Sequence, residues 1–236
     1  MKTIGLLGGM SWESTAIYYR AINRGVAQRL GGLHSARIAL YSVDFDPIEQ
    51  CQHAGDWQGT ATLLCDAAKR IEAAGADFLL ICTNTMHKIA PQIEAATALP
   101  LLHIADATAD ALLAAGISKV GLLGTAFTME QAFYKDRLSQ RYGIDVLIPG
   151  EQQRQQVHGI IYRELCAGLI RPGSKALYLS AIDELAARGA QAVILGCTEI
   201  GMLVTQQDTE VKLFDTTLLH AQAAVDYACQ TEAELT

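Results

Sequence analysis

The sequence lacks any long apolar run and any cluster of basic residues. Of its 236 residues only 18% are charged, and acidic residues outnumber basic ones by 25 to 18, which gives a formal net charge of −7. No apolar stretch approaches the roughly 18 residues that a membrane-spanning helix needs. A chain of this charge is also a poor partner for nucleic acid or for an anionic membrane surface. We therefore expect no membrane span and no nucleic-acid partner.

Paired cysteines are also lacking. The six cysteines, at positions 51, 65, 82, 166, 197 and 229, are scattered and form no C-x-x-C pair. This spacing disfavours a disulfide scaffold or a structural zinc site and is typical of a reduced, cytosolic protein. The first residues, Met1–Gly5, predict a short strand rather than a signal peptide. The expectation is a cytoplasmic protein with no metal site.

Short apolar runs bounded by glycine alternate with amphipathic segments along the whole chain. Half of the residues are apolar, which is enough for a substantial core. Regular alternation of strands and helices predicts an α/β protein with parallel sheets. The expected strands lie at residues 4–8, 36–43, 77–82, 101–104, 119–124, 145–148, 191–196 and 212–215.

One stretch occurs twice: Gly75–Thr85 aligns with Gly189–Glu199 without a gap, and in this register Thr83 lies opposite Cys197. The run Gly-Leu-Leu-Gly also recurs near the start of each half. We infer two pseudo-symmetric, three-layer α/β domains, residues 1–98 plus 208–236 and residues 99–207, that face each other across a cleft. Polar residues after a parallel strand sit where open α/β sheets bind ligands, so Thr83 and Cys197 are expected on opposite walls of that cleft.

The residue types at these two positions decide the chemistry. Cys197 ends a strand and begins a short helix, and a helix N-terminus lowers the pKa of a thiol from about 8.5. A lone cysteine after an apolar strand is also often a small core residue, so spacing alone leaves both interpretations open. Cys82 should point to the opposite face from Thr83 and is interpreted as packing.

Three motifs in order resemble the aspartate/glutamate racemase family, in its aspartate type. They are Gly5–Thr15 (GLLGGMSWEST), Cys82–His87 (CTNTMH) and Gly196–Ile200 (GCTEI). The resemblance covers essentially the whole chain. It implies two facing domains and a cofactor-independent racemase or epimerase, without pyridoxal phosphate or metal. In the family two cysteines, one per domain, work on opposite faces of the substrate α-carbon, one taking the α-proton and the other delivering a proton.

The chain departs from that pattern at the first cysteine, where it has Thr83. A hydroxyl is a far weaker acid than a thiol and cannot stand in for a thiolate, although it can relay or donate a proton. In the family the cysteine of the second motif faces the α-proton of the L-enantiomer. We therefore predict a racemase of aspartate and glutamate that is kinetically biased to L-substrates, with Cys197 and Thr83 as its catalytic residues.

Further site residues follow from the resemblance. Asn84, Thr85 and Thr198 should hydrogen-bond the substrate α-carboxylate or amine. Glu199 should assist Cys197 or serve as a helix N-terminal carboxylate, whereas His87 and Lys88 should belong to a helix rather than bind ligand. The remaining candidates for substrate contact are Met10 and Ser11, which should line the cleft, Gln52, and Thr125 and Thr128, which are equally suited to capping a helix.

The substrate side chain is less determined, because a distal carboxylate needs a cation and the segment Asp44–Gln52 contains no Lys or Arg. A broad-specificity amino-acid racemase therefore stays open. A single Cys197 would also suit a decarboxylase or isomerase of small dicarboxylates. The lost first cysteine is compatible with a catalytically inactive amino-acid-binding protein as well. Self-association as a homodimer fits the family, but no interface is evident in the sequence.

Overall fold

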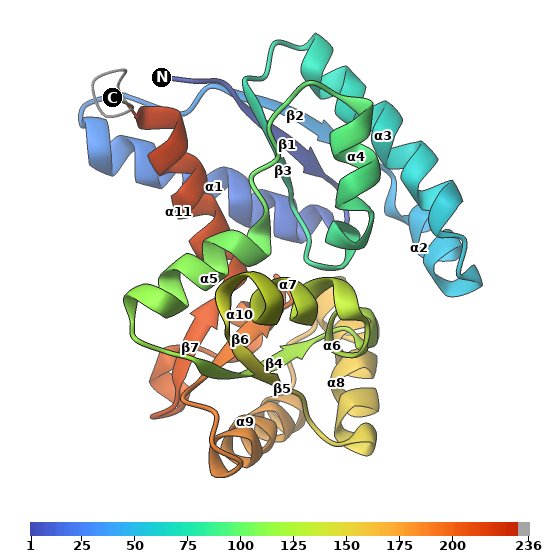
Figure 1. Cartoon of the computed structure of the whole chain (residues 1–236), viewed down its shortest axis with the longest axis vertical. Helices are drawn as coiled ribbons and strands as arrows, with labels where there is room; N and C mark the ends of the chain where they lie inside the picture. Colours follow the sequence, from blue (N-terminus) through green and yellow to red (C-terminus); the bar gives the residue numbers. More distant parts are fainter. Residues whose placement is uncertain (231–236) are drawn as a thin grey trace. The chain divides into compact units, whose positions relative to one another are not determined.

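The computed structural model describes residues 1–230 of the chain. The chain forms two compact units: Met1–His103 together with the chain from His220 onward, and Ile104–Leu219. Each unit is built around its own parallel sheet, and the strand orders are β2-β1-β3 and β5-β4-β6-β7 (Figure 1). The predicted α/β class with two parallel-sheet units is confirmed.

The first unit has a three-stranded sheet with an apolar core on each face. Its strands are β1 (Ile4–Gly8), β2 (Ile38–Ser42) and β3 (Phe78–Ile81). Alternation along β1 sends Leu7 to one core and Leu6 to the other. The first core is covered by α3 (Trp57–Ala73) and α4 (Ala90–Ala96), and the second by α1 (Trp12–Leu30) and the end of α11 (Thr216–Cys229); α2 (Phe45–Ala54) and the 3₁₀ helix η1 (Thr85–Ile89) complete the unit.

The second unit has a four-stranded sheet in which β4 and β6 are central. Its strands are β4 (Lys119–Gly124), β5 (Asp145–Leu147), β6 (Ala192–Gly196) and β7 (Lys212–Asp215). Every residue of β6 is buried, as expected for a central parallel strand. Its helices are α5 (Ile104–Ala114), α6 (Ala126–Glu130), α7 (Ala132–Tyr142), α8 (Glu151–Arg163), α9 (Pro172–Ala187) and α10 (Ile200–Leu203), with short 3₁₀ turns η2 (Leu165–Ala167) and η3 (Gln206–Asp208).

The structure differs from the sequence-based expectation at three places. The expected strand at residues 101–104 is only a single bridge from Leu101 to Leu79, and α5 already begins at Ile104. The helix expected to carry His87 and Lys88 is a 3₁₀ helix, η1, which is followed by α4 with Pro91 in its first turn. Residues 212–215 had been expected in the first domain, but β7 pairs with β6 and so lies in the second sheet.

The units therefore divide after His103 and after Leu219, and not after residues 98 and 207. The last helix still returns to the first unit, where Ala221, Ala224 and Val225 pack in its second core. Residues 231–236 of the predicted range lie outside the described part of the chain.

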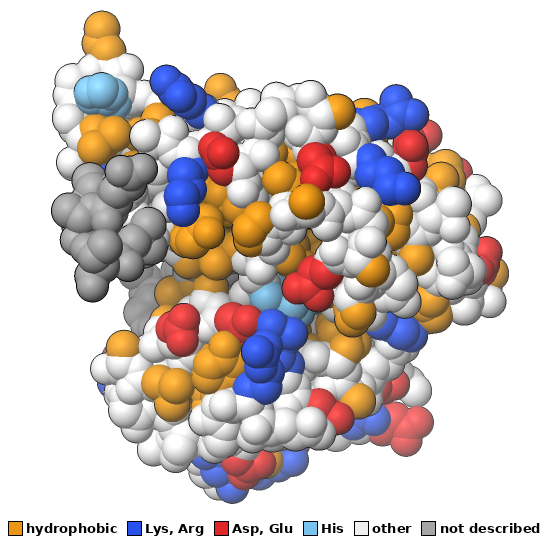
Figure 2. Space-filling model, turned by 45° about the horizontal axis from the view of Figure 1, so that its top comes forward, with side chains coloured by type: hydrophobic (Ala, Val, Ile, Leu, Met, Phe, Trp, Pro, Cys, Tyr) orange, Lys and Arg blue, Asp and Glu red, His pale blue; other side chains and the backbone are white. Residues whose placement is uncertain are grey.

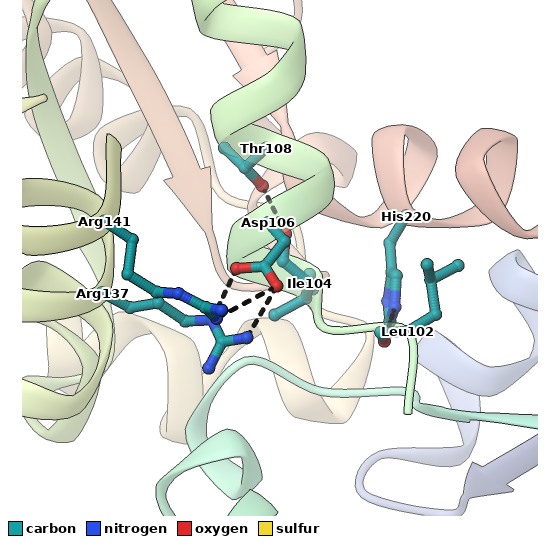
Figure 3. A network of polar contacts seen from close by, with 7 residues as sticks. All are labelled: Leu102, Ile104, Asp106, Thr108, Arg137, Arg141 and His220. Carbon is teal, nitrogen blue, oxygen red and sulfur yellow. Dashed lines mark hydrogen bonds and ion pairs between the residues drawn. The ribbon is translucent and has the colours of Figure 1, made fainter. Parts of the chain in front are cut away.

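An ion-pair network stabilises the start of α5 in the second unit. Both Asp106 carboxylate oxygens accept hydrogen bonds from Arg137, at 2.5 and 2.6 Å, and Arg141 lies 3.7 Å away (Figure 3). Partial burial of Asp106 would raise the pKa of its carboxyl, but the bidentate Arg137 guanidinium holds that pKa below its usual value. The network fixes α5 against α7.

Charges are mixed over the surface shown in Figure 2, where Lys and Arg side chains lie interspersed with Asp and Glu. Among the described helices, none combines the length and the apolar character needed to cross a membrane.

Candidate active site

The candidate residues fall into two sets, each in the segments that follow the strands of one sheet. We call residues Met10, Ser11, Gln52 and Thr83–Thr85 the first half-site, and residues Thr125, Thr128 and Cys197–Glu199 the second half-site.

Most of the first half-site lies on the turns that follow β1 and β3. Leu7 of β1 is in register with Ile81 of β3, so the two turns leave the sheet side by side. Gly9 has a φ of 97°, and a Cβ atom there would collide with the carbonyl oxygen of Val43. Only glycine fits this tight turn, which explains the Gly-Gly pair before α1.

Ser11 caps α1. Its hydroxyl oxygen accepts a hydrogen bond from the backbone N–H of Ser14 at 3.4 Å. Thr15 adds to the turn by accepting from Gly9 N–H at 2.8 Å and donating to the Ser11 carbonyl at 3.0 Å. Met10 is buried and packs in the first core with Leu7. The side chain of Met10 therefore supports the turn from within the core.

Gln52 is the most unusual polar group of the first half-site. It lies on α2, and its side chain is buried, with 2% of the residue exposed. Its amide nitrogen lies 3.9 Å from the sulfur of Met86, a weak contact, and its Oε1 has no hydrogen-bond partner among residues 1–230. Burying a carbonyl oxygen without a partner costs about 1–3 kcal/mol. Such an oxygen is ready to accept a hydrogen bond from a ligand.

The turn after β3 carries Thr83, Asn84 and Thr85. Asn84 and Thr85 are buried, whereas Thr83 is only partly buried. Cys82 is fully buried in the second core beside Phe78 and Leu80, and burial raises the pKa of its thiol. The interpretation of Cys82 as a packing residue is confirmed.

The second half-site forms where β4 and β6 end together. Gly124 and Gly196 are paired in register, and a Cβ atom on Gly124 would lie 2.8 Å from the Gly196 carbonyl oxygen. The close approach brings the two following turns side by side. Thr125 caps α6 by accepting from Thr128 N–H at 3.3 Å, and the two hydroxyls lie 3.2 Å apart. The capping role of Thr125 is thus confirmed.

Cys197 and Glu199 form a hydrogen-bonded pair in the turn after β6. The Cys197 thiol donates to Glu199 Oε2 at 2.9 Å, and the Thr198 hydroxyl donates to the same oxygen at 2.6 Å. Glu199 has 3% of its surface exposed and Cys197 has 9%. A buried carboxylate thus accepts the protons of both the thiol and the hydroxyl.

The expectation that a helix N-terminus lowers the pKa of Cys197 is wrong. Burial raises the pKa of this thiol well above its ordinary value, and the negative charge of Glu199 raises it further. The following helix, α10, spans only Ile200–Leu203, so its dipole is small. Cys197 therefore rests as a thiol whose proton already points at a base.

Cys166 and Tyr178 share the buried, negatively charged environment of Cys197 and Glu199. The sequence did not indicate that they do. Burial, followed by the charge of Glu199, raises the pKa of Cys166 to about 12. Burial also raises the pKa of Tyr178, to which Cys197 and Glu199 contribute, and its hydroxyl donates to the Val157 carbonyl at 3.2 Å. Cys166 lies in η2 and Tyr178 in α9, far from the motif along the chain. Only the fold brings them near it.

His158 is a second residue that the sequence did not single out. It lies on α8, and its Nδ1 accepts a hydrogen bond from the backbone N–H of Ala126 at 3.2 Å. Its ring packs edge-on against Phe127. His158 therefore holds the first turn of α6, which carries Thr128. A histidine inside a helix otherwise rich in glutamine and arginine gave no signal of this contact.

Arg154, Arg163 and Lys88 are engaged in contacts of their own. Arg154 of α8 is paired with Glu130 at 2.9 Å and donates to the Pro149 carbonyl, and Arg163 donates to the carbonyl of Gly159 one turn earlier. In the first unit the ammonium of Lys88 lies 3.8 Å from the centre of the Trp57 ring, and burial lowers the pKa of Lys88. Within residues 1–230 no three His, Cys, Asp or Glu side chains gather as a metal site.

Comparisons with known proteins give a consistent result. A family model described as Asp/Glu/hydantoin racemase matches residues 7–224. The crystal structure of a candidate Asp/Glu racemase from Yersinia pestis is 57% identical, with a TM-score of 0.91 over 98% of this chain and 100% of that chain. An aspartate racemase homologue from Pyrococcus horikoshii is 30% identical, with a TM-score of 0.84 over 98% and 100%. The broad specificity amino-acid racemase RacX of Bacillus subtilis is 26% identical over 240 residues, 94% of this chain and 96% of that protein.

Proposed function

Since the chain belongs to the Asp/Glu/hydantoin racemase family, we propose that it is a cofactor-independent racemase of aspartate and glutamate. Cys197 acts as the base toward the L-substrate, and Thr83 supplies a proton to the other side of the α-carbon. The observation that carries this proposal is the contact between the Cys197 thiol and Glu199, 2.9 Å long and buried in the second half-site.

The first step moves two protons in sequence. The thiol proton of Cys197 passes to Glu199 Oε2, which leaves a thiolate and a neutral carboxylic acid. The thiolate then takes the α-proton of the L-amino acid, so that an S–H bond forms, the Cα–H bond breaks and the electron pair stays on the α-carbon. Protonation of Glu199 removes the charge that opposes the thiolate, which makes the step less costly than ionising a buried thiol alone.

The second step completes inversion through Thr83. Its hydroxyl donates to the carbanion, so that a Cα–H bond forms, the O–H bond breaks, and the alkoxide left on Thr83 regains a proton from solvent water as the product leaves. The reverse role is unfavourable, because a threonine alkoxide is a far less accessible base than a thiolate. An α-proton should therefore leave L-amino acids readily and D-amino acids slowly.

This bias concerns α-proton exchange and not net racemisation. The equilibrium constant between free enantiomers is one, so a reversible racemase must have equal kcat/KM values in the two directions. Exchange without inversion is not bound by this condition, since Cys197 can return a solvent-derived proton to the face that it deprotonated. The ratio of L- to D-exchange is therefore the quantity that reports the Thr83 substitution.

Substrate anchoring is assigned by hydrogen-bonding capacity. The Thr198 hydroxyl gives its proton to Glu199, so its oxygen can only accept, and Gln52 Oε1 is also an acceptor. Both suit the α-ammonium group of the substrate. Asn84 and Thr85 on the turn after β3 suit the α-carboxylate.

Replacing Gln52 by leucine separates binding from folding. The variant Gln52→Leu should raise KM by about 10-fold, the equivalent of one lost hydrogen bond of roughly 1.4 kcal/mol. Its free energy of unfolding should stay equal or increase, because the substitution removes a buried acceptor that has no partner. Steady-state kinetics and urea unfolding measure the two quantities. A variant that loses stability while KM is unchanged would assign Gln52 to the fold instead.

Restoring the family cysteine tests the role of Thr83. The variant Thr83→Cys should increase α-proton exchange from D-amino acids by about 10- to 100-fold, because a thiolate is a competent base where an alkoxide is not. Exchange from L-amino acids should change little. The measurement is loss of the α-proton NMR signal in D₂O for each enantiomer, with Thr83→Ser as the matched control that keeps a hydroxyl. A D-exchange rate that stays at the wild-type level would count against the proposed role.

Broad specificity is the second candidate for the substrate class. Arg154 and Arg163 are engaged in contacts of their own, and Lys88 lies over Trp57, so these cations offer little to a distal carboxylate. RacX shows that a relative of similar length has broad specificity. Chiral chromatography after incubation with a panel of L-amino acids distinguishes the two substrate classes. Formation of D-aspartate and D-glutamate alone supports an aspartate/glutamate racemase, and formation of neutral D-amino acids supports broad specificity. Release of CO₂ from small dicarboxylates would instead point to a decarboxylase.

Self-association as a homodimer stays a prediction. Trp12, Tyr19 and Leu40 are exposed and line one groove of about 700 Å³ between α1 and β2. This groove is the surface at which substitutions should first be tested by sedimentation.

A further inference from the structure

Three histidines of the first unit are buried behind the turn that carries Thr83. His87 lies on η1, His103 follows β3 in the segment before α5, and His220 lies on α11; each is at most 4% exposed. The rings of His87 and His103 have their centres 4.4 Å apart, and the ring of His220 stands edge-on to His87 at 5.9 Å. A cluster of three buried imidazoles suggests a role beyond packing.

His87 contacts the Thr83 backbone directly. Its Nδ1 lies 2.8 Å from the Thr83 carbonyl oxygen. A carbonyl oxygen only accepts, so Nδ1 must carry the proton and donate. The tautomer of the neutral ring is thereby fixed, with the proton on Nδ1 and not on Nε2.

The turn is held through three successive carbonyls. The Cys82 carbonyl accepts from the Ser14 hydroxyl at 3.1 Å, the Thr83 carbonyl accepts from the His87 ring, and the Asn84 carbonyl accepts from the His87 backbone N–H at 3.1 Å. One residue, His87, therefore secures two of the three peptide groups. These peptide groups determine where the Thr83 hydroxyl points.

The ring of His87 is itself held in place. His220 Nε2 donates to the Leu102 carbonyl at 2.7 Å (Figure 3). The Tyr18 hydroxyl lies 2.8 Å from His220 Nδ1. Since Nε2 must carry the proton to reach a carbonyl, Nδ1 accepts and Tyr18 donates. Side chains from α1 and α11 thus fix one ring of the cluster, and that ring limits the rotation of His87.

We propose that His87 is a positioning residue for the reaction: its Nδ1–H fixes the Thr83 peptide group and so keeps the Thr83 hydroxyl in place for proton delivery. This inference rests on the proposed function of Thr83. Misplacing a reacting group by about 1 Å can lower a rate by about 100-fold even when binding is intact. His87 should therefore act on turnover rather than on substrate affinity.

The test compares two substitutions with a matched control. His87→Phe keeps a ring and removes the donor, and His87→Asn restores an amide N–H near the position of Nδ1. His103→Phe makes the same ring exchange at the neighbouring residue, without a bond to Thr83. For racemisation of the L-substrate, His87→Phe should lower kcat by about 10- to 100-fold with little change in KM. His87→Asn should recover most of this loss, and His103→Phe should keep kcat near the wild-type value.

Amide hydrogen exchange provides a readout that does not depend on activity. In His87→Phe the amides of Asn84 to His87 should exchange faster than in the wild type, and in His87→Asn they should regain protection. Equal kcat losses in His87→Phe and His103→Phe, or unchanged amide protection in His87→Phe, would overturn the inference. If the wild type racemises no amino acid, the proposed function fails, and the amide exchange still decides whether His87 positions the turn.

Discussion

Replacement of Cys197 by serine is expected to lower α-proton exchange from L-amino acids by on the order of 10⁴-fold, as loss of a residue that performs the proton transfer itself requires. The serine hydroxyl keeps the size of the side chain and the hydrogen bond to Glu199. Its acidity is too low for Glu199 to generate a useful base from it. The loss should therefore appear in kcat, with substrate affinity retained.

The measurement is α-proton exchange of L-aspartate in D₂O, with Cys166→Ala as the matched control. Cys166 lies in the same unit, is partly buried and has a pKa raised by burial, but it has no place in the reaction. The control should exchange at close to the wild-type rate. Equal losses in the two variants would show that exchange depends on the integrity of the second unit and not on the Cys197 thiol.

Replacement of Glu199 by glutamine is expected to lower kcat by about 10²- to 10⁴-fold, the range for loss of a general base. The same change should lower the pKa of Cys197. The Glu199 charge raises that pKa, both by repulsion of the thiolate and by accepting the hydrogen bond of the thiol form, and glutamine removes the charge. Burial persists, so the pKa of Cys197 should still exceed its ordinary value. In Glu199→Gln the Cys197 thiol should therefore ionise more easily than in the wild type, although turnover is slower.

A lower pKa of Cys197 combined with slower racemisation would identify Glu199 as a base and not merely as a neighbour that stabilises the thiol. Alkylation of Cys197 by a neutral reagent, followed across pH, should begin at lower pH in Glu199→Gln than in the wild type, while racemisation falls. Glu164→Gln is the matched control in the same unit, where the carboxylate accepts from Ser174 at 2.6 Å. Its racemisation should be nearly unchanged. Wild-type turnover in Glu199→Gln would remove Glu199 from the mechanism.

Much of the fold was predictable, because the sequence marks its strands locally. Apolar runs such as Ala192–Gly196, bounded by glycine and followed by polar residues, identify central strands and the edge at which they end. The assignment of β7 to a unit was not predictable in this way. Lys212–Asp215 has the composition of a strand, but only its pairing with β6 shows to which sheet it belongs.

The candidate site was predictable in its residue types and less so in its electrostatics. The motif around Cys197 indicated both the thiol and Glu199. The helix-terminus rule gave the wrong direction for the pKa of Cys197, because burial and a carboxylate from two residues away outweigh a four-residue helix. The contact of His87 with Thr83 spans one helical turn, but its significance depends on His103 and His220, which only the fold brings together.

The most direct test of the account is proton NMR of the protein with L- and D-aspartate and L- and D-glutamate in D₂O, beside Cys197→Ala. We expect loss of the α-proton signal from the L-enantiomers, much slower loss from the D-enantiomers, and none from either in the variant. Equal rates from both enantiomers, or exchange that survives in Cys197→Ala, would contradict it.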